Sequence, residues 1–169
     1  MKLQSDTRRR LLGGLACGAL VPSWQAARAA PAIPGEAVQW PQVRLLDGSP
    51  WDATHADGKA VVAVFWSTTC PFCKRHNAHV DKLRQAAAGR PLEIVTIARE
   101  TDPQTVRRYL ERQGWQFAVT LDQAPMRAAL STRNLIPLTV TVDRQGRLKQ
   151  VIPGEMFEED VLDLLRLGA

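Results

Sequence analysis

Two of the three cysteines in this chain, Cys70 and Cys73, lie only two residues apart in the segment "FWSTTCPFCK". A Cys-x-x-Cys pair can close a structural disulfide, supply two thiolate ligands to a metal ion, or exchange electrons between its dithiol and disulfide forms. Which of these applies depends on the compartment, on the elements around the pair and on the other ligands that the chain offers.

The pair lies where an apolar segment is followed by a helical pattern. Residues 59–66 form a continuous apolar run rich in β-branched side chains, which predicts a strand buried on both faces. Residues 71–88 repeat apolar side chains at helical spacing. Cys70 is therefore expected at the amino end of a helix, where free amide donors and the helix dipole favour a thiolate. This placement makes Cys70 the expected nucleophile and Cys73, one turn later, the resolving thiol.

A metal site is an alternative interpretation of the same segment. Cys70, Cys73, His76 and His79 form the string C-x2-C-x2-H-x2-H, which is similar to a zinc or copper ligand set. Four ligands at three-residue steps along one helix drift around its axis by about 60° per step and do not converge on one ion. We therefore expect no cofactor and no metal in the main function, and a copper- or haem-pathway binding module stays an alternative.

Residues 1–29 predict an export signal. A charged start, "MKLQSDTRRR", precedes the apolar run "LLGGLACGALV" and the small residues "AARAAPA". The "TRRRLL" motif at Thr7 indicates a twin-arginine signal, and cleavage is expected after Ala29. A Sec signal and a lipoprotein signal using Cys17 are the alternatives. Because cleavage would leave only Cys70 and Cys73 in an oxidising compartment, we expect a periplasmic protein whose pair forms a disulfide unless a donor keeps it reduced.

The basic charge of the chain is concentrated in this signal. The isoelectric point is about 9.6, but five basic residues and one acidic residue precede residue 30, which leaves the remainder at a net charge of about +1. No basic stripe with interleaved aromatic residues remains there. Nucleic-acid binding is therefore not expected.

The remaining residues predict a single domain. A Pro- and Ala-rich linker is expected at 30–42 and the folded domain at 43–169. Sequence patterns predict a hairpin at 43–52, strands at 59–66, 91–98 and 116–122, helices at 71–88, 101–114 and 124–134, a second hairpin at 137–154 and a terminal helix at 158–167. This order predicts an α/β three-layer sandwich with a mixed central sheet.

The motif FW-x3-C-x2-C-K after a buried strand, with Ile136-Pro137 ahead of the "TVTVD" hairpin, resembles the thioredoxin fold. More narrowly, the chain is similar to the exported TlpA/ResA-like thiol-disulfide oxidoreductases, which include the reductants of cytochrome c maturation. The resemblance covers nearly all of residues 43–169, including the family's central insert at 101–134. It implies that the Ile136-Pro137 bond is cis and faces the disulfide.

The same resemblance implies a function and a set of contacts. Cys70 and Cys73 would reduce disulfides in client proteins, and a membrane-bound electron donor would restore the dithiol. Substrate-binding residues would be Ile136, Pro137, Pro71, Phe72 and Trp66. An oxidase that donates its disulfide to clients is the alternative enzyme, and a thiol peroxidase has the least support.

Three departures from the family pattern limit these expectations. Thr69 replaces a common Trp before the first cysteine, and Val64 replaces the buried Asp of cytosolic thioredoxins. Glu100, at the end of the strand at 91–98, is the candidate to substitute for that Asp. The dipeptide Pro71-Phe72 differs from the usual pairs of dedicated reductants, and such residues influence the redox potential.

Overall fold

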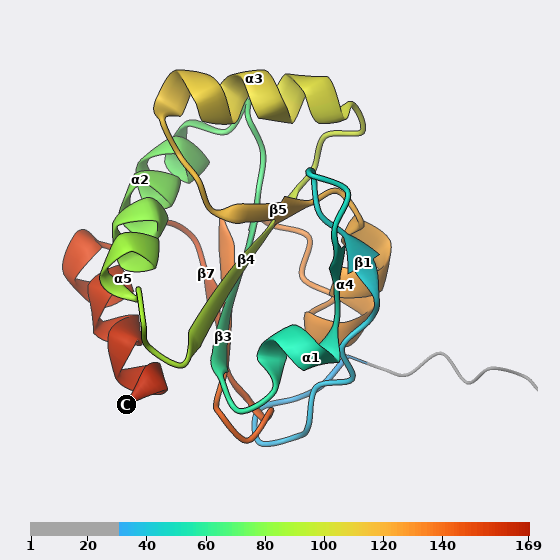
Figure 1. The fold of residues 1–169 in the computed structure, drawn as a ribbon, viewed down its shortest axis with the longest axis vertical. Helices are drawn as coiled ribbons and strands as arrows, with labels where there is room; N and C mark the ends of the chain where they lie inside the picture. The colour runs from blue at the N-terminus through green and yellow to red at the C-terminus, as the bar shows by residue number, and fades with distance from the viewer. Residues whose placement is uncertain (1–30) are drawn as a thin grey trace, which may run out of the picture.

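A computed structural model describes residues 31–169, and its centre is a five-stranded mixed sheet in the order β5-β4-β3-β6-β7. Strand β3 pairs in parallel with β4 and antiparallel with β6, so it occupies the middle of the sheet. The strands are β3 (Ala60–Trp66), β4 (Leu92–Ala98), β5 (Ala118–Thr120), β6 (Leu138–Val142) and β7 (Leu148–Pro153). Figure 1 shows this sheet at the centre of the molecule. The predicted α/β sandwich with a mixed sheet is confirmed.

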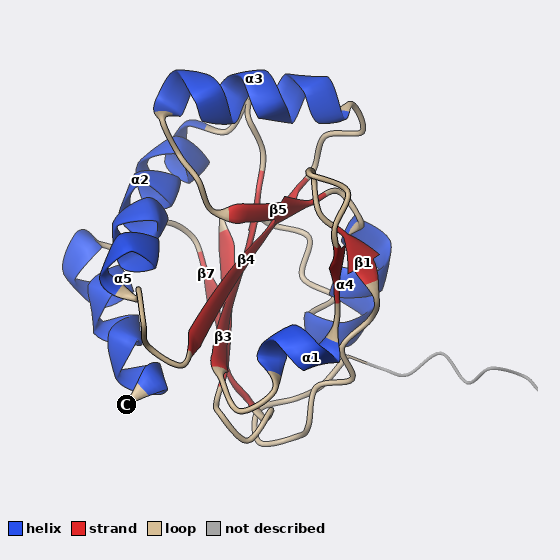
Figure 2. Ribbon diagram, in the orientation of Figure 1, coloured by secondary structure: helices blue, strands red, loops and turns tan. Residues whose placement is uncertain are grey.

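Helices cover both faces of the sheet (Figure 2). The helices are α1 (Ala53–Ala56), α2 (Pro71–Ala86), α3 (Pro103–Gln113), α4 (Gln123–Leu130), α5 (Glu158–Asp163) and the 3-10 helix η1 (Leu164–Gly168). Side chains of α2, α3 and α5 share one apolar cluster with alternate residues of β3 and β4. Side chains of α1 and α4 share a second cluster with the other residues of the same strands and with β6. The two clusters are the two cores of a three-layer sandwich.

All seven residues of β3 are buried, as its apolar run predicts for a central strand. The run ends at Trp66, and three residues with hydroxyl groups, Ser67, Thr68 and Thr69, lead to Cys70. On α2 the buried side chains include Val80 and Leu83, which pack the helix against this strand. The strand and the helix therefore fix where Cys70 lies.

The central insert contains α3, β5 and α4. Asp102 caps α3 by accepting hydrogen bonds from the amides of Gln104 and Thr105, and Gly114 ends the helix at a φ of 72°. Asp is a preferred N-cap residue and Gly a preferred residue at the left-handed end of a helix, and both lie at the ends of the segment predicted as a helix, 101–114. The prediction of a helix to residue 134 is wrong: α4 ends at Leu130, and residues 131–137 form an irregular loop before β6.

The predicted N-terminal hairpin is present as the two-residue strands β1 (Val43–Arg44) and β2 (Pro50–Trp51). Residues 31–42, expected as a linker, contact the domain. The amide of Gly35 donates to the carbonyl of Leu148, and Val38 is buried. The predicted signal at 1–29 lies outside the described residues. From residue 31 onward, the structure contains no helix with the length and apolar character needed to cross a membrane.

Candidate active site

The cysteine pair occupies the amino end of α2, where the sequence predicts it. Cys70 is the N-cap residue of the helix, and its Sγ atom accepts a hydrogen bond of 3.1 Å from the amide of Cys73. Pro71 takes the first helical position, where no amide donor is needed. Cys70 and Cys73 form a disulfide, in which Cys70 is half-buried and Cys73 is fully buried. The first cysteine is therefore the one that an incoming chain can reach.

The loop before β6 lies at the end of the sheet that carries the disulfide, because Leu138 at the start of β6 pairs with Phe65 near the end of β3. The Ile136-Pro137 peptide bond is cis, as the family resemblance implies. Ile136 is half-buried and, like Cys70, packs against the apolar cluster that contains Cys73, whereas Pro137 itself is buried. The preceding Leu135 is 42% exposed. Two segments that are distant in sequence thus lie at the same end of the sheet.

Two predicted substrate-binding residues on α2 are at the surface next to the disulfide. Pro71 is exposed, and Phe72 is 56% exposed although its side chain is large and apolar. The guanidinium of Arg75 lies 5.0 Å from the centre of the Phe72 ring and forms two hydrogen bonds with the carboxylate of Glu155. An exposed aromatic ring between the cysteines is available for contact with another chain.

The structure corrects the expectation for Trp66. Its side chain has no exposed surface and packs against the rings of Tyr109 and Phe117, with ring centres 5.7 and 6.1 Å away. A side chain in this position cannot touch a substrate chain. Trp66 therefore supports the cysteine loop from the core instead of forming part of the binding surface.

The two histidines of the alternative metal motif point to different partners. His76 is fully buried, with its Nε2 atom 2.9 Å from the Thr139 hydroxyl and its Nδ1 atom accepting from the Met156 amide at 3.3 Å. Burial lowers the pKa of His76 to about 4, so the ring is neutral near pH 7. His79 pairs with Glu158 at 3.3 Å. Among residues 31–169, no three His, Cys, Asp or Glu side chains are grouped as metal ligands.

Glu100 lies at the loop that leads to Cys70. Its Oε1 atom accepts hydrogen bonds from the Ser67 hydroxyl at 2.7 Å, from the Thr68 amide at 2.7 Å and from the Thr68 hydroxyl at 2.8 Å. Its Oε2 atom is buried and has no hydrogen-bond partner within the described part of the chain. The preceding residue, Arg99, contacts Asn134 in the other loop of the site. Sequence reasoning did not identify Arg99 or either set of contacts.

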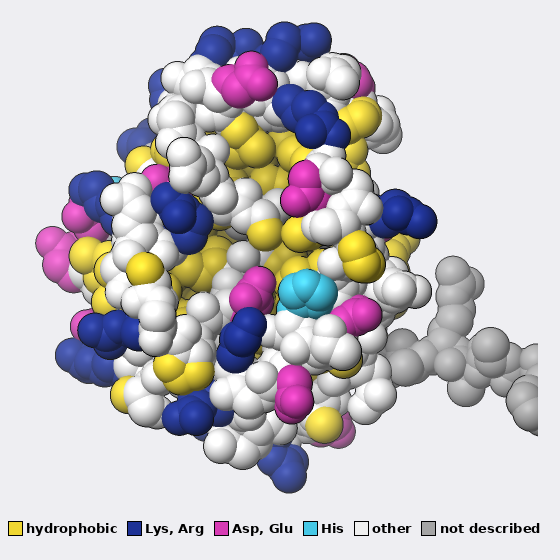
Figure 3. Space-filling model, viewed as in Figure 1, with side chains coloured by type: hydrophobic (Ala, Val, Ile, Leu, Met, Phe, Trp, Pro, Cys, Tyr) yellow, Lys and Arg dark blue, Asp and Glu magenta, His cyan; other side chains and the backbone are white. Residues whose placement is uncertain are grey.

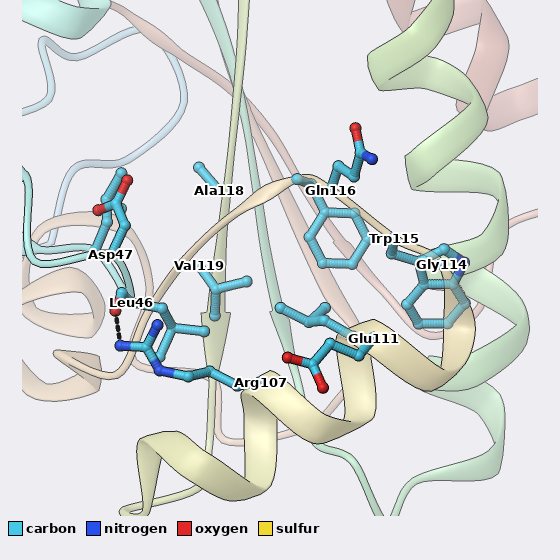
Figure 4. Close-up of a pocket in the computed structure, with 12 residues that line it drawn as sticks. Leu46, Asp47, Arg107, Glu111, Gly114, Trp115, Gln116, Ala118 and Val119 are labelled. Atoms are coloured by element: carbon cyan, nitrogen blue, oxygen red, sulfur yellow. Dashed lines mark hydrogen bonds between the residues drawn. The ribbon is translucent and has the colours of Figure 1, made fainter.

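A separate hollow of about 700 Å³ lies between α3, β5 and the turn after β1. Figure 3 shows hydrophobic side chains gathered below α3 on this face of the molecule. Leu46, Trp115 and Val119 line the hollow, and Arg107 donates a hydrogen bond across it to the Leu46 carbonyl (Figure 4). None of the residues predicted for redox chemistry lies in this hollow, so that chemistry belongs to the cysteine site.

Comparison with known sequences supports the geometric evidence. The Redoxin family model matches residues 29–165. The thiol-disulfide oxidoreductase ResA of Halalkalibacterium halodurans is 27% identical over 122 residues, which cover 72% of this chain and 69% of that protein. ResA of Geobacillus kaustophilus is 30% identical over 106 residues, which cover 62% of this chain and 60% of that protein.

Solved structures share the fold. A thiol:disulfide interchange protein of the thioredoxin family from Chlorobium tepidum has a TM-score of 0.71 at 24% identity, covering 82% of this chain and 99% of that one. A secreted disulfide oxidoreductase from Mycobacterium tuberculosis has a TM-score of 0.64 at 18% identity, covering 74% and 93%. With its Cys-x-x-Cys pair at the start of a helix and its matching family model, this chain belongs to the Redoxin family as a ResA-like thiol-disulfide oxidoreductase.

Proposed function

We propose that this oxidoreductase reduces disulfide bonds in client proteins outside the cytoplasm. The observation that carries the proposal is the position of Cys70 Sγ, which accepts the Cys73 amide at the start of α2 and is half-buried, while Cys73 is enclosed. The amide and the helix dipole stabilise negative charge on that sulfur after reduction. Exposed Phe72 and Pro71 on one side and Ile136 on the other are the proposed contacts for the client chain, with Pro137 holding the second loop in place.

The proposed reaction transfers two electrons from the dithiol to the client. The Cys70 thiolate attacks one sulfur of the client disulfide, a mixed disulfide forms, and the other client sulfur leaves as a thiolate that takes up a proton. Cys73 then loses its proton and attacks Cys70 Sγ, which releases the second client thiol and leaves the Cys70–Cys73 disulfide. A membrane-bound dithiol donor would return two electrons and two protons.

Insulin reduction by dithiothreitol, followed by turbidity, tests this proposal. We expect wild-type protein to accelerate the reaction and Cys70→Ser to abolish the acceleration, because serine cannot form the mixed disulfide. Activity retained by Cys70→Ser would remove the proposal.

The direction of electron flow is tested by the reduction potential. We expect a value near the thioredoxin range, about −270 mV, whereas a value near about −120 mV would assign the oxidase function instead.

Titration of the reduced protein with zinc or copper tests the binding-module alternative. That alternative would be favoured if the reduced protein binds the metal tightly at a stoichiometric ratio and loses this binding when Cys70 and Cys73 are oxidised.

The location of the protein depends on the predicted signal. We propose that residues 1–29 direct export by the twin-arginine route and that 30–42, which pack on the domain from residue 31 onward, act in the periplasm together with 43–169. The support is the "TRRRLL" motif together with relatives such as the secreted oxidoreductase of M. tuberculosis. Changing Arg8 and Arg9 to Lys should leave the protein in the cytoplasmic fraction. Unchanged export of this variant would contradict the twin-arginine assignment.

A role in cytochrome c maturation is the specific form of this proposal. The haem-attachment motif C-x-x-C-H of an apocytochrome must be reduced before haem is attached, and in an oxidising compartment it forms a disulfide. We expect a strain without this protein to lose covalently bound haem and to regain it with added dithiothreitol. Normal haem attachment in that strain would leave general disulfide reduction as the function.

A further inference from the structure

Two consecutive residues at the carboxyl end of β4 reach the two loops that form the site. Arg99 and Glu100 directly follow β4, and the Arg99 amide donates to the carbonyl of Trp66 at the end of β3. Side chains alternate between the two faces of a strand. Just beyond the strand, the side chains of these consecutive residues contact different loops: Glu100 bonds to Ser67 and Arg99 to Asn134.

Glu100 holds the loop that carries the first cysteine. Three donors from Ser67 and Thr68 converge on its Oε1 atom at 2.7 to 2.8 Å. The Ser67 hydroxyl has one proton, which it donates to Glu100, so the Thr69 hydroxyl donates to Ser67 across 3.1 Å. The network thus reaches Thr69, the residue before Cys70. Three donors on one oxygen are the arrangement that an ionised carboxylate accepts.

Arg99 holds the loop that carries the cis-proline. Its Nη2 atom donates to the carbonyl of Asn134 at 2.5 Å and to the side-chain oxygen of the same residue at 2.6 Å. Asn134 is two residues before Ile136. The guanidinium therefore fixes the backbone of this loop just before the segment that is proposed to contact the client.

A second guanidinium reaches the same loop from α4. Arg127 donates to the carbonyl of Arg133, and its guanidinium carbon lies 4.6 Å from the centre of the Phe65 ring. Burial and the nearby charge of Arg99 lower the pKa of Arg127. The loop at 131–137 therefore accepts hydrogen bonds from two arginine side chains, Arg99 and Arg127. Of these two, only Arg99 is adjacent in sequence to Glu100, which binds the cysteine loop.

We propose that Arg99 and Glu100 are a pair of positioning residues that hold the cysteine loop and the cis-proline loop at a fixed separation. This inference rests on the proposed function, since it assigns the two residues to different parts of disulfide exchange. Arg99 positions the surface that a client chain contacts. Glu100 positions Thr69 and Cys70, and its negative charge near the cysteine loop opposes the thiolate that the start of α2 favours.

The two residues should then affect different measurements. With Arg99→Gln we expect KM for insulin to rise about tenfold, because the charge-assisted hydrogen bonds to Asn134 are lost. The pH profile of Cys70 alkylation should stay as in the wild type. With Glu100→Gln we expect that profile to move to lower pH by about one unit, because the negative charge bound to the cysteine loop at Ser67 and Thr68 is removed.

The experiment uses the reduced protein that begins at residue 30, without the predicted signal. It measures the kinetics of insulin reduction, the rate of iodoacetamide alkylation as a function of pH, and the temperature of thermal unfolding. Arg90→Gln and Glu111→Gln are matched controls, because both side chains are exposed and neither forms a hydrogen bond or an ion pair within the described part of the chain. The alkylation profile requires no client, so a wild type that fails to reduce insulin would remove the proposed function without deciding the inference about Glu100.

A higher KM in Arg99→Gln alone and a shifted alkylation profile in Glu100→Gln alone would support the proposal. Arg99→Gln and Glu100→Gln proteins that match their controls in both KM and alkylation profile would overturn it. A lower unfolding temperature with unchanged KM and unchanged profile would also overturn it, because the residues would then serve stability alone. Identical shifts of both quantities in both variants would show one general loosening of the site and equally contradict two separate positioning roles.

Discussion

At the scale of single residues, the two cysteines differ in what can reach them. Cys70 is half-buried at the amino end of α2, and Cys73 has no exposed surface. We expect Cys73→Ser to accumulate a mixed disulfide between Cys70 and its client, because the resolving thiol is missing. Non-reducing gel electrophoresis of the variant incubated with a disulfide-containing client checks this expectation.

The matched control for this trap is the Cys70→Ser variant. It retains the enclosed cysteine, which an incoming chain cannot reach, so it should form little of the same adduct. Equal amounts of adduct from both single variants would mean that Cys73 is accessible and that the order of attack is wrong.

His76 makes a separate prediction about pH. Its pKa is lowered to about 4 by burial, with a further contribution from His79, compared with 6.5 for an ordinary histidine. Below pH 6.5 the unfolded chain takes up a proton that the folded chain does not, so stability falls as the pH decreases toward 4. We expect this residue to contribute a loss of about 2 kcal/mol in the free energy of unfolding between pH 6.5 and 4.5.

Urea unfolding of wild type and His76→Gln at several pH values measures this contribution. Glutamine does not titrate, and its amide can still donate to the Thr139 hydroxyl. The variant should therefore be less sensitive to pH in this window, even if its stability at pH 7 is lower. Parallel pH dependence in the two proteins would show that His76 is not the group responsible.

At the scale of elements, the site depends on how α2 packs against the sheet. Leu83 is fully buried in the cluster that also contains Val64 and Cys73. We expect Leu83→Ala to reduce the free energy of unfolding by about 2–5 kcal/mol, the range for large-to-small changes in a core. The midpoint of urea unfolding measures the loss.

An exposed position on another helix provides the control for that experiment. Arg108→Ala on α3 removes a largely exposed side chain and should change the midpoint only slightly. If Leu83→Ala unfolds at the same urea concentration as this control, the packing of α2 does not depend on the cluster.

Elements with local signals were predictable, and contacts between distant segments were not. The apolar run of β3 and the capping residues Asp102 and Gly114 act within a few residues, so their elements could be read from the sequence. By contrast, Glu100 bonds to Ser67 and Thr68 across more than thirty positions. No short pattern encodes such a contact, because it depends on the parallel pairing of β3 with β4.

The same reasoning explains the corrections at the site. An apolar pattern predicts that a run of residues is buried without saying which member reaches the surface, and Trp66 is the last buried residue of its run. The end of α4 was misplaced because residues 131–134 have no Gly or Pro to stop a helix. The loop that replaces its last turn is held by Arg99, which follows β4, and by Arg127 of α4 itself.

At the scale of the whole molecule, the domain begins earlier than its regular elements indicate. Residues 31–42 run along the end of the β6–β7 hairpin, where the amide of Val38 donates to the carbonyl of Gly146 and Ala37 forms a bridge with Arg147. The Trp40 ring packs edge-on against Trp51 at 5.1 Å. The sequence predicts a linker here, but these contacts attach the segment to the apolar cluster on the α4 side of the sheet.

Removing this segment should therefore weaken the whole fold. We expect a protein that begins at Val43 to unfold at lower urea concentration than one that begins at Ala30, because buried Val38 and the hydrogen bonds of Gly35 and Val38 are lost. Both proteins retain every residue of the active site, so iodoacetamide should still reach reduced Cys70 in the shorter one under native conditions. A shared unfolding midpoint would mean that 31–42 adds no stability and serves only as a connection.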